Sequence, residues 1–409
     1  MPEQTVHDGA PVGRIALLGA DLPGLRPKLL CEQGSRIKRG QAVFHDRAHP
    51  EVVFASPISG VVESITLGPR RSLSALVIRR ETGHHEPDPV KMAMSSATAV
   101  RAALLANGFW PAFLTRPFGR IPAPDAAPEA IFVTVTADNP HAPDPRVVLA
   151  GQHEVFAAGL KALALLTDGT VHVCQSQGAD IAAGLGDRIR GAFFSSGAAS
   201  GLAGTHIHRL HPVGWGRSVW SIGYQDVLSI GRLIETGIPD CSRVVAIVGP
   251  RAKQPRLLRT VAGASLQELI REETVTGTGG APLCVLSGSA ENGRKASWLG
   301  RYHHQITLLD DAPKPVNTPE RGVMARFRRA SSMPAPLVPT AALERALSLD
   351  VPVVPFLRAL SVGDAETASR LGCLEMVEED LAAVSLACTS GADYRRMLRH
   401  VLDELAEDA

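Results

Sequence analysis

The sequence predicts a multidomain α/β protein that ends in a helical bundle. Three observations lead to this fold class: paired short strands at the N-terminus, an alternation of strand and helix patterns in the middle, and helical periodicity near the C-terminus. With 409 residues the chain is too long for one ordinary hydrophobic core. Its 45% hydrophobic and 20% charged residues are typical of globular proteins.

Composition excludes several classes of function. A net charge of +1 and 4% aromatic residues give no basic surface for nucleic acid. The N-terminus lacks the pattern of a secretory signal. The most apolar long window, residues 147–166, contains Gln152, Glu154 and Lys161, which a bilayer would disfavour. Six cysteines scattered singly indicate a reducing compartment, so we expect a cytoplasmic protein without membrane spans.

The N-terminal part predicts a small β-sandwich with two similar halves. Strand-like pieces at 15–18, 42–44, 52–54, 61–65 and 75–79 are separated by turns, and Gly34 and Gly40 supply the positive φ of two of them. The segments GSRIKRGQAV and SPISGVV resemble the paired motifs of the biotinyl/lipoyl barrel-sandwich hybrid. In a carrier of that fold, the modified lysine lies seven residues before the Ser-Pro pair. His49 occupies that position here, so we expect the fold without the covalent arm.

The middle of the chain predicts a Rossmann-like, parallel α/β layer. A β-branched run at 131–136, a helical pattern at 148–166, a strand at 170–175 and a further helical pattern at 179–193 follow one another. A dinucleotide site requires G-x-G-x-x-G between a strand and a helix. Gly184 and Gly186 lie inside the helical pattern and Gly191 is out of register, so we expect no nucleotide cradle.

Residues 201–230 concentrate glycines, histidines and aromatic residues. We expect His206 and His208 to alternate on a strand, with His211 after them, so that the first two face the same side. No cysteine or carboxylate joins them at ligand spacing. The pattern therefore favours histidines that form hydrogen bonds at a domain boundary over a metal site.

The last third predicts a small β-grasp domain and a helical bundle. Strands at 243–248, 256–260 and 282–286 surround a helix at 263–270, where Ser265 and Glu268 have the spacing of a capping box. Helical patterns follow at 341–347, 354–360, 365–371, 378–386 and 394–405. Cys373 and Cys388 are expected to be buried small hydrophobes. The motifs of serine hydrolases, zinc proteases and P-loop proteins do not occur.

Several collinear runs resemble the A subunit of the sodium-translocating NADH:quinone oxidoreductase. They are ALLG (16–19), RIKRGQAVF (36–44), FASPISG (54–60), TRPF (115–118), GTHIH (204–208), WSIGYQDV (220–227) and RYH (301–303), with further runs at 333–345 and 357–374. The A subunit is related to the C subunit of the Rnf complex and to the NADH-binding subunit of complex I.

The resemblance implies a peripheral subunit on the cytoplasmic face of the bacterial inner membrane. It would belong to a six-subunit complex that couples electron transfer from NADH to ubiquinone with sodium export, and the membrane-embedded B subunit would be its main partner. The β-grasp domain would be of the SLBB type. FMN, FAD and iron-sulfur centres are expected on other subunits. The absence of C-x-x-C agrees with a chain that holds no cluster.

The resemblance and the sequence together suggest where a ligand could lie. We expect quinone or partner contact at His206, His208, Trp215, Trp220 and Tyr224, because aromatic side chains and neighbouring glycines suit a flat ring. No catalytic, cofactor-binding or metal-ligating residue is expected in this chain. One alternative is a stand-alone flavin- and NADH-binding oxidoreductase. The other is a biotin or lipoate carrier, which the missing carrier lysine makes the least favoured.

The expected domains are 1–90 (barrel-sandwich), 91–235 (Rossmann-like), 236–310 (β-grasp), 311–335 (a basic linker) and 336–409 (helical). The family begins with a further glycine-rich strand that precedes the counterpart of residue 2. We therefore expect either that the start codon was placed too late or that this strand is missing. In the linker, Arg321, Arg326, Arg328 and Arg329 suit either a solvated loop or contact with lipid phosphates or a partner.

Overall fold

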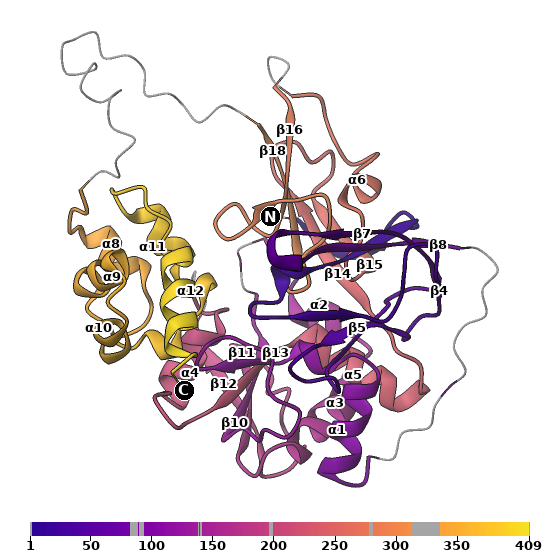
Figure 1. Cartoon of the computed structure of the whole chain (residues 1–409), viewed down its shortest axis with the longest axis horizontal. Helices are drawn as coiled ribbons and strands as arrows, with labels where there is room; N and C mark the ends of the chain where they lie inside the picture. The colour runs from indigo at the N-terminus through magenta and orange to yellow at the C-terminus, as the bar shows by residue number, and fades with distance from the viewer. Residues whose placement is uncertain are drawn as a thin grey trace.

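Three sheet-containing units and one helical unit make up the molecule (Figure 1). A computed structural model describes residues 2–81, 89, 94–137, 139, 141–195, 199–277, 281–311 and 336–408. The four arginines expected in the basic linker lie outside these residues. Among the residues that the structure describes, no helix combines the length and apolar composition that crossing a bilayer requires.

The N-terminal unit is a sandwich of two small antiparallel sheets. One contains β2 (Arg14–Leu18), β8 (Leu73–Arg80), β7 (Gly60–Leu67) and β4 (Arg36–Ile37) in that order; the other contains β3 (Pro27–Leu29), β5 (Ala42–Asp46) and β6 (Val53–Ala55). Between them Phe44 and Phe54 stack with ring centroids 4.5 Å apart. Gly34 and Gly40 have φ of 88° and 79°, so the predicted strands and their glycine turns are confirmed.

The second unit is a five-stranded sheet with helices on both faces. Its strands are β12 (Ile189–Phe194), β11 (Thr170–Ser176), β10 (Ala130–Val135), β13 (Val219–Gly223) and β9 (Leu114–Arg116), in that order. Only the edge strand β9 is antiparallel to its neighbour. The helices are α1 (Ala97–Ala106), α2 (Pro145–Leu149), α3 (His153–Leu165), α4 (Ala203–Leu210) and α5 (Tyr224–Thr236).

Alternation along β10 explains why helices cover both faces of this sheet. Ile131 and Val133 belong to the large core that includes residues of α3 and α5, whereas Phe132 belongs to a second cluster with Ile207 of α4. Because successive side chains of a strand point to opposite faces, a strand with large apolar residues on both faces must be covered on both. α3 and α5 therefore pack on one face and α4 on the other.

Two segments of this unit differ from the sequence prediction. Residues 179–193 are turns followed by β12, because Gly184 and Gly186 adopt φ of 76° and 118°, which no helix accommodates. His206 and His208 lie on the helix α4 and not on a strand. Two positions apart on a helix, their side chains point in nearly opposite directions rather than to the same side.

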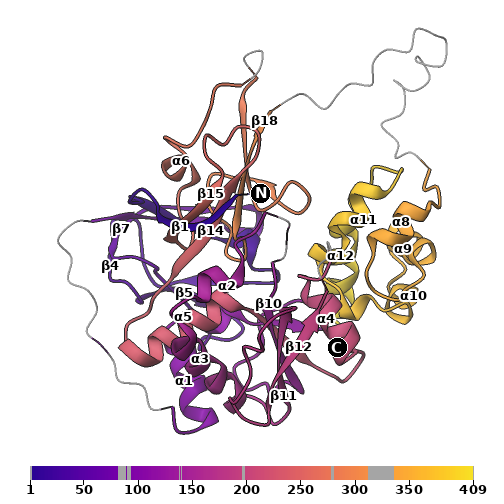
Figure 2. The same ribbon diagram turned by 180° about the vertical axis from the view of Figure 1, so that it is seen from behind.

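The third unit is a six-stranded mixed sheet. It contains β1 (Glu3–Asp8), β15 (Arg256–Val261), β14 (Ser242–Val248), β18 (Gln305–Asp310), β16 (Leu283–Ser287) and β17 (Arg294–Lys295) in that order, with the short helix α6 (Leu266–Leu269) beside it. β1 pairs in parallel with β15, although its sequence precedes the N-terminal sandwich (Figure 2). The first strand of the chain therefore joins the first and third units.

The C-terminal unit is a bundle with its own hydrophobic core. It contains α8 (Ala341–Ala346), α9 (Val353–Val362), α10 (Ala365–Arg370), α11 (Ala382–Ala387) and α12 (Tyr394–Leu405), with a 3-10 turn at Glu378–Leu381. These helices lie close to the predicted positions. Cys373 is fully buried and Cys388 is 7% exposed, so their prediction as buried hydrophobes is confirmed. The bundle lies against α4 and β9 of the second unit (Figures 1 and 2).

Candidate functional site

The sheet of the second unit has a topological switch point between β10 and β13. From β10 the chain continues to β11 and β12 on one side and then returns to place β13 on the other side. The strand order reverses between these two parallel strands, and ligands of open α/β sheets bind at the carboxyl ends of the strands at such a point. A cavity of about 110 Å³ occupies this position, and we call it the switch-point pocket.

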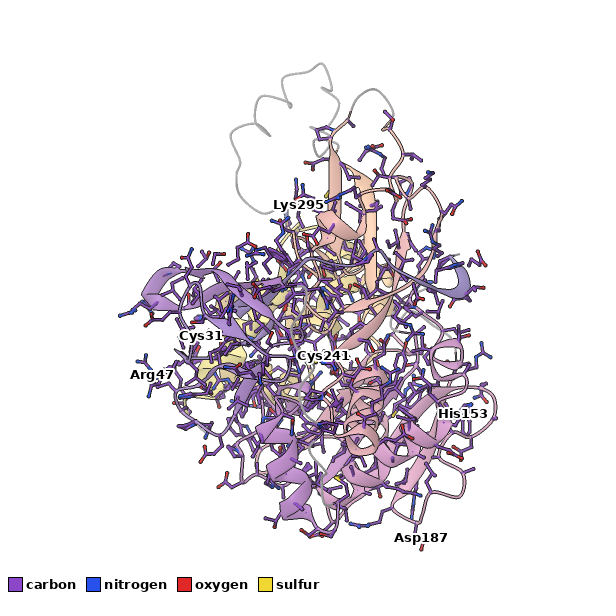
Figure 3. The ribbon with its side chains drawn as sticks, turned by 90° about the vertical axis from the view of Figure 1, so that its right-hand side faces the viewer. Cys31, Arg47, His153, Asp187, Cys241 and Lys295 are labelled. Carbon is purple, nitrogen blue, oxygen red and sulfur yellow. The ribbon has the colours of Figure 1, made fainter. Side chains whose placement is uncertain are left out.

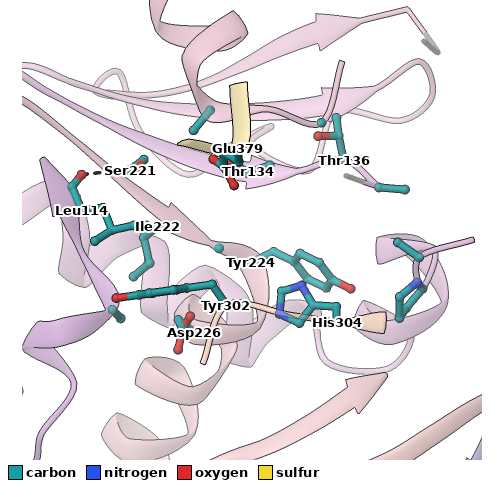
Figure 4. A pocket seen from close by; sticks show the side chains of 17 residues that line it. Leu114, Thr134, Thr136, Ser221, Ile222, Tyr224, Asp226, Tyr302, His304 and Glu379 are labelled. Carbon is teal, nitrogen blue, oxygen red and sulfur yellow. Dashed lines mark hydrogen bonds between the residues drawn. The ribbon is translucent and has the colours of Figure 1, made fainter. Parts of the chain in front are cut away.

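Three units of the molecule line the switch-point pocket (Figure 4). The second unit supplies the ends of β10 and β13 and the start of α5, including Thr136 and Tyr224. The third unit supplies Tyr302 and His304, which precede β18, and the helical bundle supplies Glu379. The pocket is therefore complete only when all three units pack together.

The lining of the pocket is aromatic and hydroxylic, with two carboxyl groups. The aromatic rings of Tyr224 and His304 have centroids 5.9 Å apart. The hydroxyl group of Tyr302 donates a 2.9 Å hydrogen bond to the carbonyl group of Pro111, and burial raises the pKa of Tyr302 to about 12. Thr136 is 4% exposed, and its hydroxyl group has no hydrogen-bond partner among the described residues. A ligand can therefore form a hydrogen bond with this hydroxyl group without breaking an existing one.

The two carboxyl groups differ in their environment. Asp226 is buried and accepts a hydrogen bond from Arg243, whose other guanidinium nitrogen donates to Ser229 at 3.0 Å. Glu379 belongs to the bundle, and its Oε1 lies 3.9 Å from Nη2 of Arg116. Burial and the neighbouring Asp380 carboxyl raise the pKa of Glu379 to about 7, although 46% of its side chain remains accessible to solvent. Among the described residues that line the pocket there is no lysine or arginine.

The five residues predicted for ligand contact occupy different places. Tyr224 lines the switch-point pocket, and Gly201 and Ala203 from the same predicted segment line it as well. Trp220 is fully buried within an aromatic cluster, with its ring centroid 5.3 Å from those of Trp110 and Phe113. Trp220 therefore supports the pocket from inside the core.

The other three predicted residues lie on α4 or shortly after it. His206 is fully buried, its Nε2 is 2.7 Å from the carbonyl oxygen of Ser200, and burial lowers its pKa to about 4. Trp215 is 53% exposed and donates from Nε1 to Ser369 Oγ of the bundle at 3.0 Å. His208 lies between the second unit and the bundle. The alternative that the sequence favoured, histidines bonded at a domain boundary, is confirmed for His208.

Glu375 connects the bundle to the second unit by three contacts. Its Oε2 lies 2.5 Å from Nδ1 of His208, and its Oε1 accepts a 2.9 Å hydrogen bond from the backbone amide of Val213. The carbonyl oxygen of Glu375 accepts a hydrogen bond of 3.3 Å from Nε of Arg116. Since the backbone amide of Asp350 donates to Nε2 of His208 at 3.1 Å, this geometry assigns the proton to Nδ1. We call this contact surface the bundle interface.

Family models match three parts of the chain. The NqrA N-terminal barrel-sandwich hybrid domain matches residues 1–81, the NqrA second alpha/beta domain matches 95–238, and the NQRA C-terminal domain, of the SLBB type, matches 244–297. Full-length relatives, each named as the A subunit of a Na(+)-translocating NADH-quinone reductase, are 38% identical in Neisseria gonorrhoeae and 39% identical in Serratia proteamaculans. Each alignment covers 100% of this chain and 96% of the relative.

The chain belongs to the NqrA family, the A subunits of the Na(+)-translocating NADH-quinone reductases. A more distant relative of the same name, from Rhodopirellula baltica, is 36% identical over 100% of this chain. Among solved structures, an NAD+-reducing NiFe-hydrogenase covers 75% of this chain, with a TM-score of 0.39 and 14% identity. This chain spans 63% of that hydrogenase chain.

Metal-ligating and thiol side chains of this NqrA family member are dispersed. Within the described ranges, no three histidine, cysteine, aspartate or glutamate side chains gather as a metal site. The six cysteines are free thiols, and Cys31 and Cys241 lie well apart in Figure 3. The prediction that this chain holds no metal or cofactor stays a prediction. At the position of a carrier lysine, His49 lies in the turn between β5 and β6.

Sequence reasoning missed most lining residues of the pocket in this NqrA family member, among them Asp226, Tyr302 and Glu379. Asp226 and Tyr302 lie within the runs WSIGYQDV and RYH that carry the family resemblance, so a signal for them was present. Glu379 gave no comparable signal, because it lies in an acidic turn of the bundle, far along the chain from β13. Its position depends on how the bundle packs against α4.

Proposed function

We propose that this chain is a peripheral subunit of a membrane NADH:quinone oxidoreductase that exports sodium, and that it contacts the ubiquinone head group in the switch-point pocket. The full-length relatives carry that activity in their names. The single observation that carries the quinone contact is the composite pocket at the carboxyl ends of β10 and β13. Ligands of open α/β sheets bind at this place.

The chemistry of the pocket suits an uncharged, planar ring. Tyr224, Tyr302 and His304 offer aromatic surface, while Gly201 and neighbouring small residues let a ring approach the backbone. The hydroxyl group of Thr136 can donate to a quinone oxygen. A quinone head group carries no charge, so it requires no cationic partner.

The same lining opposes the alternative of a stand-alone flavin- and NADH-binding enzyme. Flavin and nicotinamide nucleotides carry phosphate groups, which bind most tightly where arginine or lysine supplies positive charge. The start of α5 lines the pocket, but its first turn carries the carboxyl group of Asp226 there. The pocket is lined by Asp226 and Glu379, and His304 is the one basic side chain among its described lining residues. FMN, FAD and iron-sulfur centres are accordingly assigned to other subunits of the complex.

The remaining subunits are the proposed partners, with the membrane-embedded B subunit foremost. We place the chain on the cytoplasmic face of the bacterial inner membrane, held there by its partners. A tagged full-length chain, purified from cells that express the whole complex, is expected to bring down the B subunit together with NADH:quinone reductase activity. Recovery of the chain alone, or with bound flavin, would contradict this assignment.

A binding experiment tests the quinone contact directly. Titration calorimetry with a short-chain ubiquinone is expected to give saturable binding to the purified chain. Ala137→Trp places a large ring at the pocket and should abolish the binding. Ala150→Trp places the same ring at an exposed position that does not line the pocket, and it should leave the binding unchanged. Equal loss of binding in both variants, or no binding to the wild-type chain, contradicts the proposed contact.

A further inference from the structure

A second cavity lies beside the switch-point pocket, between α4 and the helical bundle. Its volume is about 270 Å³. Its lining mixes apolar residues with polar side chains, among them Arg209, Arg345 and Glu291, together with Asn292 and Ser348. We call it the outer cavity. A cavity of this size with polar groups on its walls accommodates several water molecules that find hydrogen-bond partners there.

Glu379 lines both cavities. Among the described residues, it is the one that the switch-point pocket and the outer cavity share. It belongs to the 3-10 turn Glu378–Leu381, which the bundle places against the second unit. An ionisable side chain between a ligand pocket and a water-accessible cavity can contact both the ligand and water.

Charged groups surround Glu379 from every element that packs near it. Asp380 and Glu378 flank it on its own turn, and Arg116 of β9 approaches to 3.9 Å. Asp226 and His304 share the switch-point pocket with it. On the side of the outer cavity, Asp380 is joined by Arg209, Arg345 and Glu291. The carboxyl groups of Asp380 and Glu378 favour the protonated form of Glu379, and Arg116 favours the carboxylate.

We propose that Glu379 exchanges protons between water in the outer cavity and the quinone oxygen in the switch-point pocket. This inference rests on the proposed function, because it requires quinone in that pocket. Reduction of one quinone to quinol takes two electrons, which NADH supplies through the other subunits, and two protons. Each proton leaves the Glu379 carboxyl group and forms an O–H bond on a quinone oxygen. Water from the outer cavity then returns a proton to the carboxylate.

The electrostatic environment agrees with this geometry. A group that both accepts and releases a proton works best when its pKa lies near the working pH. Burial and the adjacent Asp380 raise the pKa of Glu379 above the usual glutamate range, while Arg116 opposes that shift. Access to solvent over 46% of the side chain gives protons a route to the carboxyl group.

Substitution of Glu379 in the assembled complex tests the proposal. Glu379→Gln keeps the size and shape of the side chain but removes its titration. We expect quinol formation to slow by at least about tenfold, and its dependence on pH near neutrality to flatten. The affinity of the purified chain for short-chain ubiquinone should stay unchanged. Glu379→Asp retains a carboxyl group and should restore part of the rate.

Glu291→Gln is the matched control, because Glu291 lines the outer cavity and not the switch-point pocket. It should leave both the rate and its pH profile unchanged. An unchanged rate in Glu379→Gln, with quinone still bound, overturns the proton exchange and leaves the proposed function standing. A loss of affinity that accounts for the whole rate loss also overturns it. If the wild-type chain binds no quinone, the proposed function itself fails and the inference fails with it.

Discussion

Arg116 is a fully buried guanidinium group at the bundle interface. Its Nη2 lies 4.0 Å from Oδ2 of Asp380 and 3.9 Å from Oε1 of Glu379. The Asp380 side chain is fully buried as well, and its Oδ1 accepts no hydrogen bond from the described residues. A buried carboxylate of this kind depends on its cationic neighbour, because removal of one partner leaves an uncompensated charge.

Arg116→Met is therefore expected to lower the free energy of unfolding by about 3–5 kcal/mol at neutral pH. Arg120→Met is the control: Arg120 pairs with Asp403 across the same interface at 3.0 Å, but both side chains are more than a third exposed. Such a pair contributes about 1 kcal/mol or less. Denaturant unfolding of both variants measures the difference, and equal losses would contradict this account of Arg116.

His206 is expected to make stability depend on pH. Its pKa is lowered from 6.5 to about 4 by burial, so between these values the unfolded chain binds a proton that the folded chain excludes. Stability contributed by the neutral ring is complete above pH 6.5 and is lost as the pH falls toward 4. The loss amounts to about 3 kcal/mol over this range.

Thermal unfolding between pH 4 and 7 measures this effect. His206→Gln retains a donor for the carbonyl of Ser200, so it should fold and show a smaller decrease in stability with falling pH. His153→Gln removes an exposed histidine at the start of α3 (Figure 3) and should keep the wild-type slope. If both variants keep that slope, another buried group causes it.

At the scale of elements, α6 connects the N-terminal sandwich to the six-stranded sheet through hydrogen bonds. The sequence predicted a capping box, and Ser265 does accept a hydrogen bond from the backbone amide of Glu268 at 3.4 Å. The Glu268 carboxylate instead binds the start of β2. It accepts one hydrogen bond from the amide of Gly13 at 2.6 Å and another from Nε of Arg14 at 2.8 Å. Burial opposes its ionisation, but these hydrogen bonds keep the pKa of Glu268 below its usual range.

Glu268→Ala should therefore cost about 1.5–3 kcal/mol, the range for hydrogen bonds to a charged group. The exposed Glu272 follows α6, and Glu272→Ala should change stability by no more than about 0.5 kcal/mol. Chemical denaturation gives both values. A loss below that of Ser265→Ala, which is expected to be about 1 kcal/mol, would assign the capping interaction the larger role.

At the scale of the whole molecule, the helical bundle has its own core and reaches the second unit through polar contacts. Glu375→Ala removes the side-chain acceptor of His208 and of the Val213 amide. We expect faster hydrogen exchange in α4 and in the turn Cys373–Glu375, because local opening of the interface becomes less costly. Exchange in β10 and β11 should not change.

Hydrogen exchange monitored by mass spectrometry separates these segments. Glu366→Ala is the control, since Glu366 pairs with Arg370 on the exposed side of α10, within the bundle. It should leave exchange at the interface unchanged. Uniformly faster exchange in Glu375→Ala would indicate global destabilisation and contradict a local role. The bundle interface also holds Glu379 at the switch-point pocket. Glu375→Ala should therefore also slow the proton exchange proposed for Glu379.

The sequence by itself determined the order of the structural elements and the family. Strand periodicity, glycine turns and helical patterns depend on near neighbours, so they placed the sandwich strands, β10, β11, β14 and the bundle helices close to their observed bounds. Local patterns predicted the wrong secondary structure in two places. At 179–193 the positive φ of the glycines prevents a helix, and at α4 packing against β10 favours a helix over the predicted strand. The tertiary structure alone decided that β1 joins the third unit, and that Tyr224, Tyr302 and Glu379 meet in one pocket. Such contacts join residues far apart in the chain, and packing between units, which no local spacing encodes, brings them together.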